Sequence, residues 1–291
     1  MNPHSLLFVP GDSERKFAKA AGGAADALIL DLEDAVAPQS KPMARERVRG
    51  FLKSPRTGAS AQLWVRINAL NTADSPLDLA AIVTAGPYGL VVPKVDHPSE
   101  LTELSDRLNA LEGQAGIAIG STRLIPLLES PRAILTAADY LRTPLARLSG
   151  ISWGAADLGA ALGTRSSHDA DGDWNFALRS ARVQCLWVAR ALGVDAIDTV
   201  TTDFKNVDAL RAECIRSYQT GFDAKLAIHP DQVSVINSIF LPSPAELDHA
   251  RRVIAAFEAA PGFGAVSLNG TMLDIAHLHA ARRLLGERDT Y

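Results

Sequence analysis

The chain has 291 residues, of which 47% are hydrophobic and 21% are charged, and its formal net charge is −4. This composition excludes a disordered chain and is sufficient for a sizeable core. No run of Lys or Arg suggests nucleic-acid binding, and no apolar segment approaches the roughly 18 residues of a membrane span. Two cysteines, Cys185 and Cys214, lack metal-type spacing, and the N-terminus lacks a signal-peptide pattern. We therefore expect a cytoplasmic globular protein.

Eight short apolar runs are typical of buried strands, and most are separated by helix-like stretches. The runs span residues 6–10, 27–31, 63–68, 89–94, 123–129, 148–153, 196–200 and 225–229. Helical signatures cover residues 13–22, 76–85, 99–111, 131–141, 176–192 and 207–220. Continuous apolar strands that alternate with helices indicate a parallel sheet covered on both faces. Eight such units favour an α/β fold, a closed (β/α)8 TIM barrel formed by residues 1–242.

A C-terminal extension, residues 243–291, follows the predicted barrel. Residues 243–259 look like its closing helix, and a Gly-rich hinge follows at 262–264. A short strand or turn at 265–270 then leads into an amphipathic helix at 274–285. This pattern predicts a helical lid, or an arm that packs on a neighbouring subunit.

Polar side chains gather where the predicted strands end. The clearest case is the sequence Leu-Ile-Leu-Asp-Leu-Glu-Asp at 28–34, where Asp31, Glu33 and Asp34 follow an apolar run. Unpaired buried carboxylates are very costly, so a divalent cation, or its water shell, would resolve the conflict. Other polar residues at strand ends are Arg66, Asn68, Lys94, Glu129, Asp198 and His229. Barrel enzymes assemble their active sites at this rim from several strands.

Two further carboxylates form a candidate metal site. Glu129 ends the fifth predicted strand, and Asp157 lies in a Gly-punctuated loop after the sixth. Because these strands are neighbours in a barrel, the two side chains should converge and offer the hard oxygen ligands that Mg²⁺ favours. The alternative is a pair of helix caps or surface acids. Asp31, Glu33 and Asp34 could also ligate the metal, but we favour a role in holding its waters and neighbouring ligands.

Several cationic residues are candidates for substrate binding. Arg66 could stabilise an enolate or carboxylate oxygen, or simply pair with a rim carboxylate. Lys94 could form a Schiff base, but an ammonium that balances the nearby carboxylates is favoured. Arg15 and Lys19 share one helical face and could bind phosphates, or form a solvated stripe. His229 is equally consistent with a base and a structural histidine. No GxGxxG or P-loop pattern occurs, which argues against dinucleotide or nucleoside triphosphate chemistry.

Seven segments together resemble the citrate lyase β-subunit-like family of malyl-CoA, citramalyl-CoA and citryl-CoA lyases, within the HpcH/HpaI aldolase superfamily. They run in the family's order and cover nearly the whole chain: Leu7-Phe8-Val9-Pro10-Gly11, Asp31-Leu32-Glu33-Asp34-Ala35-Val36, Val65-Arg66-Ile67-Asn68, Pro93-Lys94, Leu128-Glu129-Ser130-Pro131, Asp157-Leu158-Gly159 and Ile228-His229-Pro230. The resemblance implies a (β/α)8 barrel, Mg²⁺, a CoA-thioester substrate and a homo-oligomer, often a trimer or hexamer.

The resemblance also implies roles for individual residues. Glu129 and Asp157 would bind Mg²⁺, and Arg66 would contact the thioester or enolate oxygen. The CoA-thioester side of the site would comprise Arg15, Lys19, Pro93 and Lys94. In the extension, Met272-Leu273-Asp274 matches an element whose aspartate is delivered to a neighbouring subunit's site as the acid/base.

Three positions depart from the family pattern. Ala276 stands where a proline usually follows the catalytic aspartate, the turn at 221–225 reads Gly-Phe-Asp-Ala-Lys, and Thr199 replaces a common glycine. None removes an expected metal ligand, but all bear on substrate identity and lid geometry.

The expected reaction is reversible, Mg²⁺-dependent C–C cleavage of a 3-hydroxyacyl-CoA thioester to acetyl-CoA and an α-keto acid. Two alternatives remain: a carrier-protein-bound citryl lyase subunit of a larger complex, and a CoA-independent, metal-dependent pyruvate aldolase. Thioester hydrolysis after cleavage or condensation is also open. The α-keto acid is not identified, because small substrate differences are often worth only about 1–3 kcal/mol in a pocket.

Overall fold

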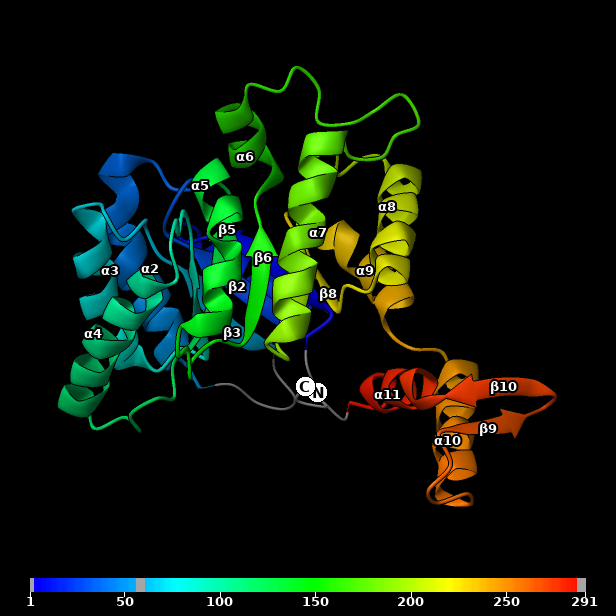
Figure 1. Ribbon diagram of the computed structural model, residues 1–291. Coiled ribbons are helices and arrows are strands. Elements are labelled where there is room, and N and C mark those ends of the chain that lie inside the picture. The colour runs from blue at the N-terminus through cyan, green and yellow to red at the C-terminus, as the bar shows by residue number, and fades with distance from the viewer. Residues whose placement is uncertain (1–2, 56–60, 287–291) are drawn as a thin grey trace.

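Eight parallel strands close into a barrel in the computed structural model, which describes residues 3–55 and 61–286 (Figure 1). In chain order the strands are β1 (Ser5–Pro10), β2 (Ala27–Asp31), β3 (Gln62–Arg66), β4 (Gly89–Val92), β5 (Arg123–Leu128), β6 (Gly150–Trp153), β7 (Asp195–Asp198) and β8 (Ala224–Ala227). Each strand pairs with the next, and β8 pairs with β1, so the sheet has no free edge. The predicted (β/α)8 barrel is confirmed.

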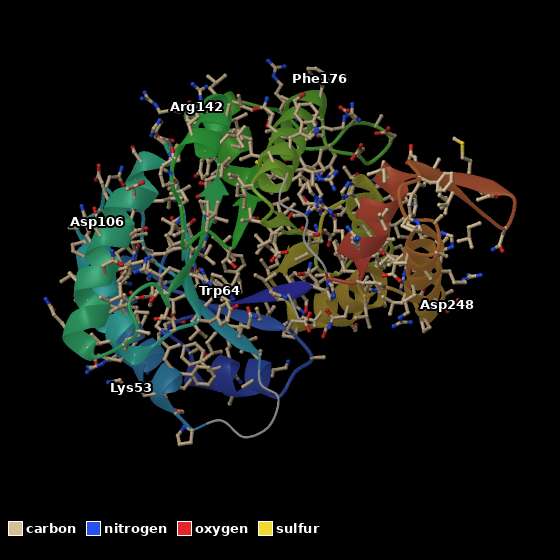
Figure 2. All side chains as sticks on the ribbon, turned by 60° about the horizontal axis from the view of Figure 1, so that its bottom comes forward. Lys53, Trp64, Asp106, Arg142, Phe176 and Asp248 are labelled. Carbon is tan, nitrogen blue, oxygen red and sulfur yellow. The ribbon has the colours of Figure 1, made fainter. Side chains whose placement is uncertain are left out.

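The strands are apolar on both faces, as their continuous hydrophobic runs predict. Alternate side chains such as Ile29, Trp64 and Leu127 fill the barrel interior, and Figure 2 shows Trp64 among the packed side chains. The intervening residues, for example Leu28 and Leu30, face the surrounding helices and belong to a larger apolar layer. This period of two puts successive residues of a strand in different environments.

Helices and short 3-10 turns surround the sheet. They are α1 (Glu14–Ala21), η1 (Pro38–Ser40), α2 (Lys41–Lys53), α3 (Asp74–Ile82), η2 (Val83–Ala85), α4 (Ser99–Ala115), α5 (Pro131–Leu135), η3 (Ala137–Arg142), α6 (Ala155–Leu162), α7 (Phe176–Ala191), α8 (Val207–Thr220) and α9 (Pro230–Phe240). Cys185 and Cys214 are buried, free thiols within α7 and α8. No helix in residues 3–55 or 61–286 is long and apolar enough to cross a membrane.

The helix that closes the barrel differs from the predicted one. Helix α9, which sequence analysis left out, packs against both β8 and β1 and completes the outer layer. The helix expected to close the barrel is α10 (Pro244–Glu258), and it belongs to the C-terminal extension instead. Pro230 at the start of α9 and the capping box of His229 and Gln232 define where the closing helix begins.

The C-terminal extension forms an arm with a small core of its own. Its elements after α10 are β9 (Ala265–Leu268), β10 (Thr271–Asp274) and α11 (Ile275–Leu284), and the two strands form an antiparallel hairpin. Val253, Phe257, Leu273 and Leu278 are buried within this unit. In Figure 1 the arm (orange and red) stands at the lower end of the barrel, whereas α6 lies at the upper end.

Candidate active site

Asp31 and Arg66 form the rigid base of the site where β2 and β3 end. Their strands are paired in register at these two residues. Arg66 Nε and Nη2 donate to the two Asp31 carboxylate oxygens at 2.7 and 2.6 Å. Those oxygens also accept the backbone N–H groups of Glu33 and Ala35. Because all of these hydrogen bonds converge on Asp31, its carboxylate orients Arg66 and the following loop.

Glu33 connects Arg66 to Lys94. Its Oε2 lies 2.9 Å from Arg66 Nη1, and its Oε1 accepts a 2.7 Å hydrogen bond from Lys94 Nζ. Burial raises the pKa of Glu33 despite both cations. Although burial opposes the charged form of Lys94, hydrogen bonding and the charge of Glu33 raise its pKa. The contacts therefore fit the charge-balancing role predicted for this lysine.

The backbone of Lys94 is aimed at Glu129. Lys94 has φ of 54°, one of two non-glycine residues of residues 3–55 and 61–286 with positive φ. This left-handed conformation, uncommon for a lysine, directs the backbone N–H to Glu129 Oε1 at 2.8 Å. Strained backbone of this kind often occurs at functional sites. Pro93, which precedes it, is buried.

Glu129 directly follows β5, and Asp157, in the helix after β6, lies close enough for its negative charge to act on Glu129. The Glu129 carboxyl is buried, and burial, followed by the negative charge of Asp157, raises its pKa to about 8. Asp157 lies in the first turn of α6 rather than in a loop, so the sequence interpretation was wrong on that point. The helix carries the carboxylate toward Glu129, because the neighbouring strands β5 and β6 are paired.

Gly154 makes room for the Glu129 carboxylate. A Cβ at position 154 would lie 2.3 Å from Glu129 Oε2 and 2.7 Å from Glu129 Cβ. No side chain larger than hydrogen fits without moving Glu129. The position of Gly154 directly after the sixth predicted strand was the signal in the sequence that could have identified this role.

The Glu129 and Asp157 carboxylates fit a bound Mg²⁺ ion. A buried carboxyl that faces a second negative charge is unfavourable alone, and a divalent cation would offset both charges. No group of three or more His, Cys, Asp or Glu side chains in the described part of the chain is arranged to hold a metal. Mg²⁺ usually keeps several waters and takes one or two protein carboxylates, so a pair suffices.

Three other predicted site residues, Asp34, Arg15 and Lys19, are exposed to solvent. Asp34 is exposed and lies 3.7 Å from Lys94 Nζ. Arg15 and Lys19 are exposed on α1. Lys19 also lines a hollow of about 110 Å³ between α1 and the start of α9, together with Pro230.

Asp274 lies at the junction of β10 and α11, in the arm. It caps α11, accepting the backbone N–H of His277, and its side chain is half exposed. The His277 side chain, and then its backbone N–H, lower the pKa of the Asp274 carboxyl. The half-exposed position of Asp274 in a single chain therefore does not provide the desolvation that would raise this pKa.

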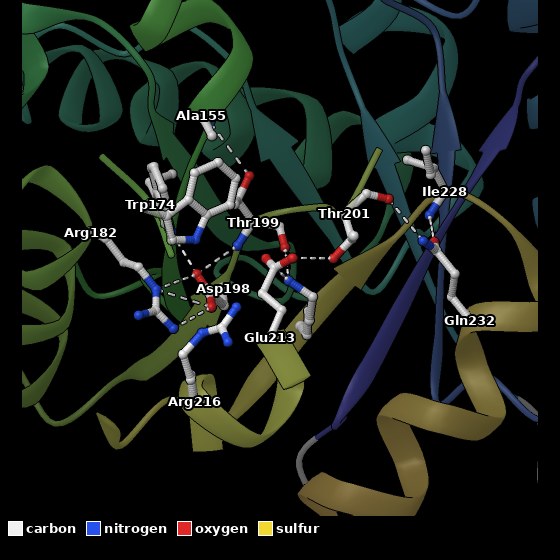
Figure 3. A network of polar contacts seen from close by, with 12 residues as sticks. Ala155, Trp174, Arg182, Asp198, Thr199, Thr201, Glu213, Arg216, Ile228 and Gln232 are labelled. Atoms are coloured by element: carbon white, nitrogen blue, oxygen red, sulfur yellow. Dashed lines mark hydrogen bonds and ion pairs between the residues drawn. The ribbon is translucent and has the colours of Figure 1, made fainter. Parts of the chain in front are cut away.

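Asp198 does not belong to the active site, although it was grouped with the other strand-end residues. It is fully buried outside the barrel and accepts hydrogen bonds from Trp153 Nε1 and Arg182 (Figure 3). Lys225 and the Asp198–Arg182 pairing lower the pKa of Asp198 to about 2. Asn68 is likewise buried and holds Asp78 and the backbone of Leu32. These residues stabilise the walls of the barrel.

Comparisons with known proteins show the family to which the chain belongs. The family model described as HpcH/HpaI aldolase/citrate lyase matches residues 4–230, and the chain belongs to this family. It is 36% identical over 287 residues to "(3S)-malyl-CoA thioesterase" of Cereibacter sphaeroides, covering 98% of this chain and 94% of that protein. It is also 36% identical over 287 residues to "Citrate lyase subunit beta" of Escherichia coli, covering 98% and 93%.

A solved structure of this family resembles the chain over nearly its whole length. The crystal structure of CitE from Mycobacterium tuberculosis in complex with magnesium, acetoacetate and coenzyme A superimposes with a TM-score of 0.77 at 35% identity, covering 98% of this chain and 97% of that one. The chain is therefore an enzyme of a family with lyase and thioesterase relatives, some of them crystallised with magnesium.

Proposed function

We propose that the protein is a Mg²⁺-dependent lyase that cleaves, or forms, a 3-hydroxyacyl-CoA thioester such as malyl-CoA, citramalyl-CoA or citryl-CoA. The products would be acetyl-CoA and an α-keto acid. The observation that carries the proposal is the pairing of the buried Glu129 with the half-buried Asp157, beside the Arg66 that Asp31 and Glu33 orient. The CitE structure with magnesium, acetoacetate and coenzyme A supports the same combination of ligands.

The acidic part of the site binds and orients the substrate. Glu129 and Asp157 would hold Mg²⁺, which supplies Lewis-acid polarisation and a template for the substrate oxygens when bound. Lys94 and Glu33 balance the charge around them. Asp34 and Asp31 would hold waters and neighbouring groups in place rather than bind the metal, since Asp31 is already saturated with hydrogen bonds.

Arg66 is proposed to stabilise the negative charge that develops on the thioester oxygen. Its guanidinium lies over the Phe8 ring, 4.8 Å from the ring centre, and is held by two carboxylates. Hydrogen bonding and charge from Asp31 raise its pKa, so it stays protonated. A preorganised cation at the site of developing charge often makes a large contribution to catalysis.

Asp274 is proposed to transfer the proton to and from the methyl carbon of the acetyl group. In cleavage, Asp274 would protonate the enolate carbon, and in condensation it would remove a methyl proton. The arm of one chain would reach the site of a neighbouring chain in a homotrimer or hexamer, with Arg15 and Lys19 near the CoA phosphates. The separation of the arm from α6 in Figure 1 supports delivery between subunits.

Thioester hydrolysis is the second candidate, because one relative carries the name (3S)-malyl-CoA thioesterase. The same Arg66 would then stabilise charge on the thioester oxygen, while water attacks the carbonyl carbon. The two reactions differ in products: a lyase releases a keto acid, and a thioesterase releases free CoA and a hydroxy acid.

An assay of purified protein with Mg²⁺ against malyl-CoA, citramalyl-CoA and citryl-CoA tests the proposal, with the keto acid trapped as its phenylhydrazone. We expect one thioester to yield keto acid, and expect EDTA or Glu129→Ala to abolish the yield. Glu103→Ala, at an exposed acid in α4, serves as a control and should retain activity. If none of the three thioesters is cleaved although Mg²⁺ binds, the proposal is wrong.

A further inference from the structure

Asp274 and His277 form a reciprocal pair at the start of α11. Asp274 Oδ1 accepts the backbone N–H of His277 at 3.3 Å, and His277 Nδ1 lies 2.6 Å from the same oxygen. The backbone N–H of Asp274 points back to Nδ1 at 3.2 Å. This is a capping box in which an imidazole occupies the position that Glu or Gln usually takes.

The two contacts to Nδ1 need different protonation states of the ring. A protonated Nδ1 donates to the Asp274 carboxylate across 2.6 Å. An unprotonated Nδ1 accepts the backbone N–H of Asp274, or the proton of a neutral Asp274 carboxyl. A Gln at this position would cap the helix equally but holds no titratable proton. The imidazole therefore adds a movable proton beside the carboxyl.

The pair is open to solvent and has few charged neighbours on the hairpin. The side chains of Asp274 and His277 are 52% and 53% exposed. Strand β9 carries no ionisable residue, and Asp274 is the only one on β10. The neighbouring helices α10 and α11 contribute the remaining ionisable groups of this unit: Glu246, Asp248, His249, Arg251, Arg252, Glu258, His279, Arg282 and Arg283. Of these, Glu258 and Arg282 line a groove beside Ile275, the residue after Asp274.

We propose that His277 relays protons between Asp274 and solvent, an inference that rests on the acid/base role proposed for Asp274. In cleavage, Asp274 gives its proton to the enolate carbon, a C–H bond forms, and a carboxylate remains. His277, neutral with its proton on Nδ1, takes a proton from solvent at Nε2 and passes its Nδ1 proton to Asp274. The ring is then neutral with its proton on Nε2, and proton exchange with solvent restores the Nδ1-protonated form before the next turnover. The carbinol proton that cleavage releases to solvent balances the proton taken up. Condensation runs the same steps in reverse.

Two variants separate the relay from helix capping. His277→Gln retains the capping-box side chain, so its thermal unfolding midpoint should match that of the wild type. Its kcat should fall by about 10²-fold, the low end for a positioned proton transfer, with KM unchanged. His277→Ala leaves space for a small base, and added imidazole should restore much of its kcat. Imidazole should leave Asp274→Asn inactive.

Each outcome bears on one of the two assignments. The relay would be overturned if His277→Gln kept the wild-type kcat, or if imidazole did not restore the kcat lost in His277→Ala. In either case the kcat of Asp274→Asn would still test the acid/base role of Asp274. Full turnover by Asp274→Asn would overturn that role, and the relay with it. Absence of thioester turnover by the wild-type protein would also remove both.

Discussion

Glu129 retains its proton more strongly than an ordinary glutamate because its carboxyl is buried and faces Asp157. A metal ion binds the deprotonated form, so binding must displace this proton whenever the pH lies below the carboxyl pKa. Between about pH 4.5 and 8, the folded apoprotein therefore still holds a proton on Glu129 that the unfolded chain has already released. This stabilising contribution is present at low pH and is lost as the pH rises through about 8.

We predict that the apparent affinity for Mg²⁺ falls as the pH drops below about 8, by up to about tenfold per pH unit for one displaced proton. Calorimetric Mg²⁺ titrations between pH 6.5 and 9 in buffers of different ionisation enthalpy measure both the affinity and the released proton. An affinity that does not change over this range would show that Glu129 is not the titrating ligand.

Gly154 makes a second residue-scale test possible. A methyl group at position 154 would collide with the Glu129 carboxylate, whereas the backbone φ of −112° suits any residue. Gly154→Ala should therefore weaken Mg²⁺ binding at least about tenfold by displacing a ligand. The matched control is Gly113→Ala in α4, where a Cβ meets nothing within 4 Å. The idea fails if both variants bind Mg²⁺ like the wild type.

Positions at strand ends predicted much of the site, but the direction of each side chain was not considered. Asp31, Arg66 and Glu129 do meet at the rim, as expected. Asp198 does not, because Ile197 fills the barrel interior and the next side chain must face outward. The alternation was present in the sequence and could have excluded Asp198. The left-handed backbone of Lys94 carried no such signal, since a lysine is not expected there.

At the scale of whole elements, a buried polar network connects strands β7 and β8 to helices α7 and α8 (Figure 3). Asp198 on β7 pairs with Arg182 on α7, and Lys225 on β8 donates to Glu213 on α8 at 2.8 Å. Lys225 also donates to the backbone oxygen of Thr199 at 2.6 Å. The backbone N–H of Thr199, a departure from the family pattern, donates to Asp198 Oδ1 at 3.0 Å, so charged groups on β7 and β8 hold its backbone.

Breaking this network should destabilise the barrel strongly. Arg182→Met would leave the fully buried Asp198 carboxylate without its main partner, which typically costs about 3–5 kcal/mol. Arg252→Ala removes a partner of Asp248 on the exposed face of α10 and should cost at most about 1 kcal/mol. Urea unfolding of both variants makes the comparison. Equal losses of unfolding free energy in the two variants would mean that other groups stabilise the Asp198 carboxylate without Arg182.

Strands were easier to predict than helices for physical reasons. Strand β2 matches its predicted range because a buried parallel strand is a continuous apolar run. Helix α2 carries Pro42 near its start and Gly50 inside, both poor helix signals. Helix α6 has only eight residues, contains Gly159 and lies between Gly154 and Gly163, and α9 contains several β-branched residues. Packing against the barrel, which no local pattern reveals, stabilises these three helices.

At the scale of the whole molecule, the sequence predicted the arm but not the surface on which the arm packs. The hinge and α11 follow the predicted order, whereas a hairpin of two strands, β9 and β10, stands where one short strand or turn was expected. Met272 and Phe263 are exposed on this unit, 72% and 68% respectively. Large exposed apolar side chains often mark association surfaces, which agrees with an arm that packs on another subunit.

If sites are shared between subunits, two inactive variants should complement each other. Glu129→Ala lacks the metal ligand and Asp274→Asn lacks the acid/base. A mixed oligomer would contain sites with an intact barrel from one chain and an intact arm from another. Random association in a ring should restore about one quarter of wild-type turnover. Copurification through different affinity tags on the two variants would verify mixed assembly. No recovery in verified mixed oligomers would place Asp274 in the site of its own chain or in none.

C–C bond cleavage at the Mg²⁺ site is the central property proposed for this protein, and product analysis of one reaction tests it directly. Purified protein with Mg²⁺ and the thioester it consumes fastest would be quenched early, and acetyl-CoA, keto acid and free CoA quantified together. We predict equal amounts of acetyl-CoA and keto acid, with both lost in Glu129→Ala. Free CoA and the intact hydroxy acid, formed without any keto acid, would contradict the lyase assignment and identify a thioesterase.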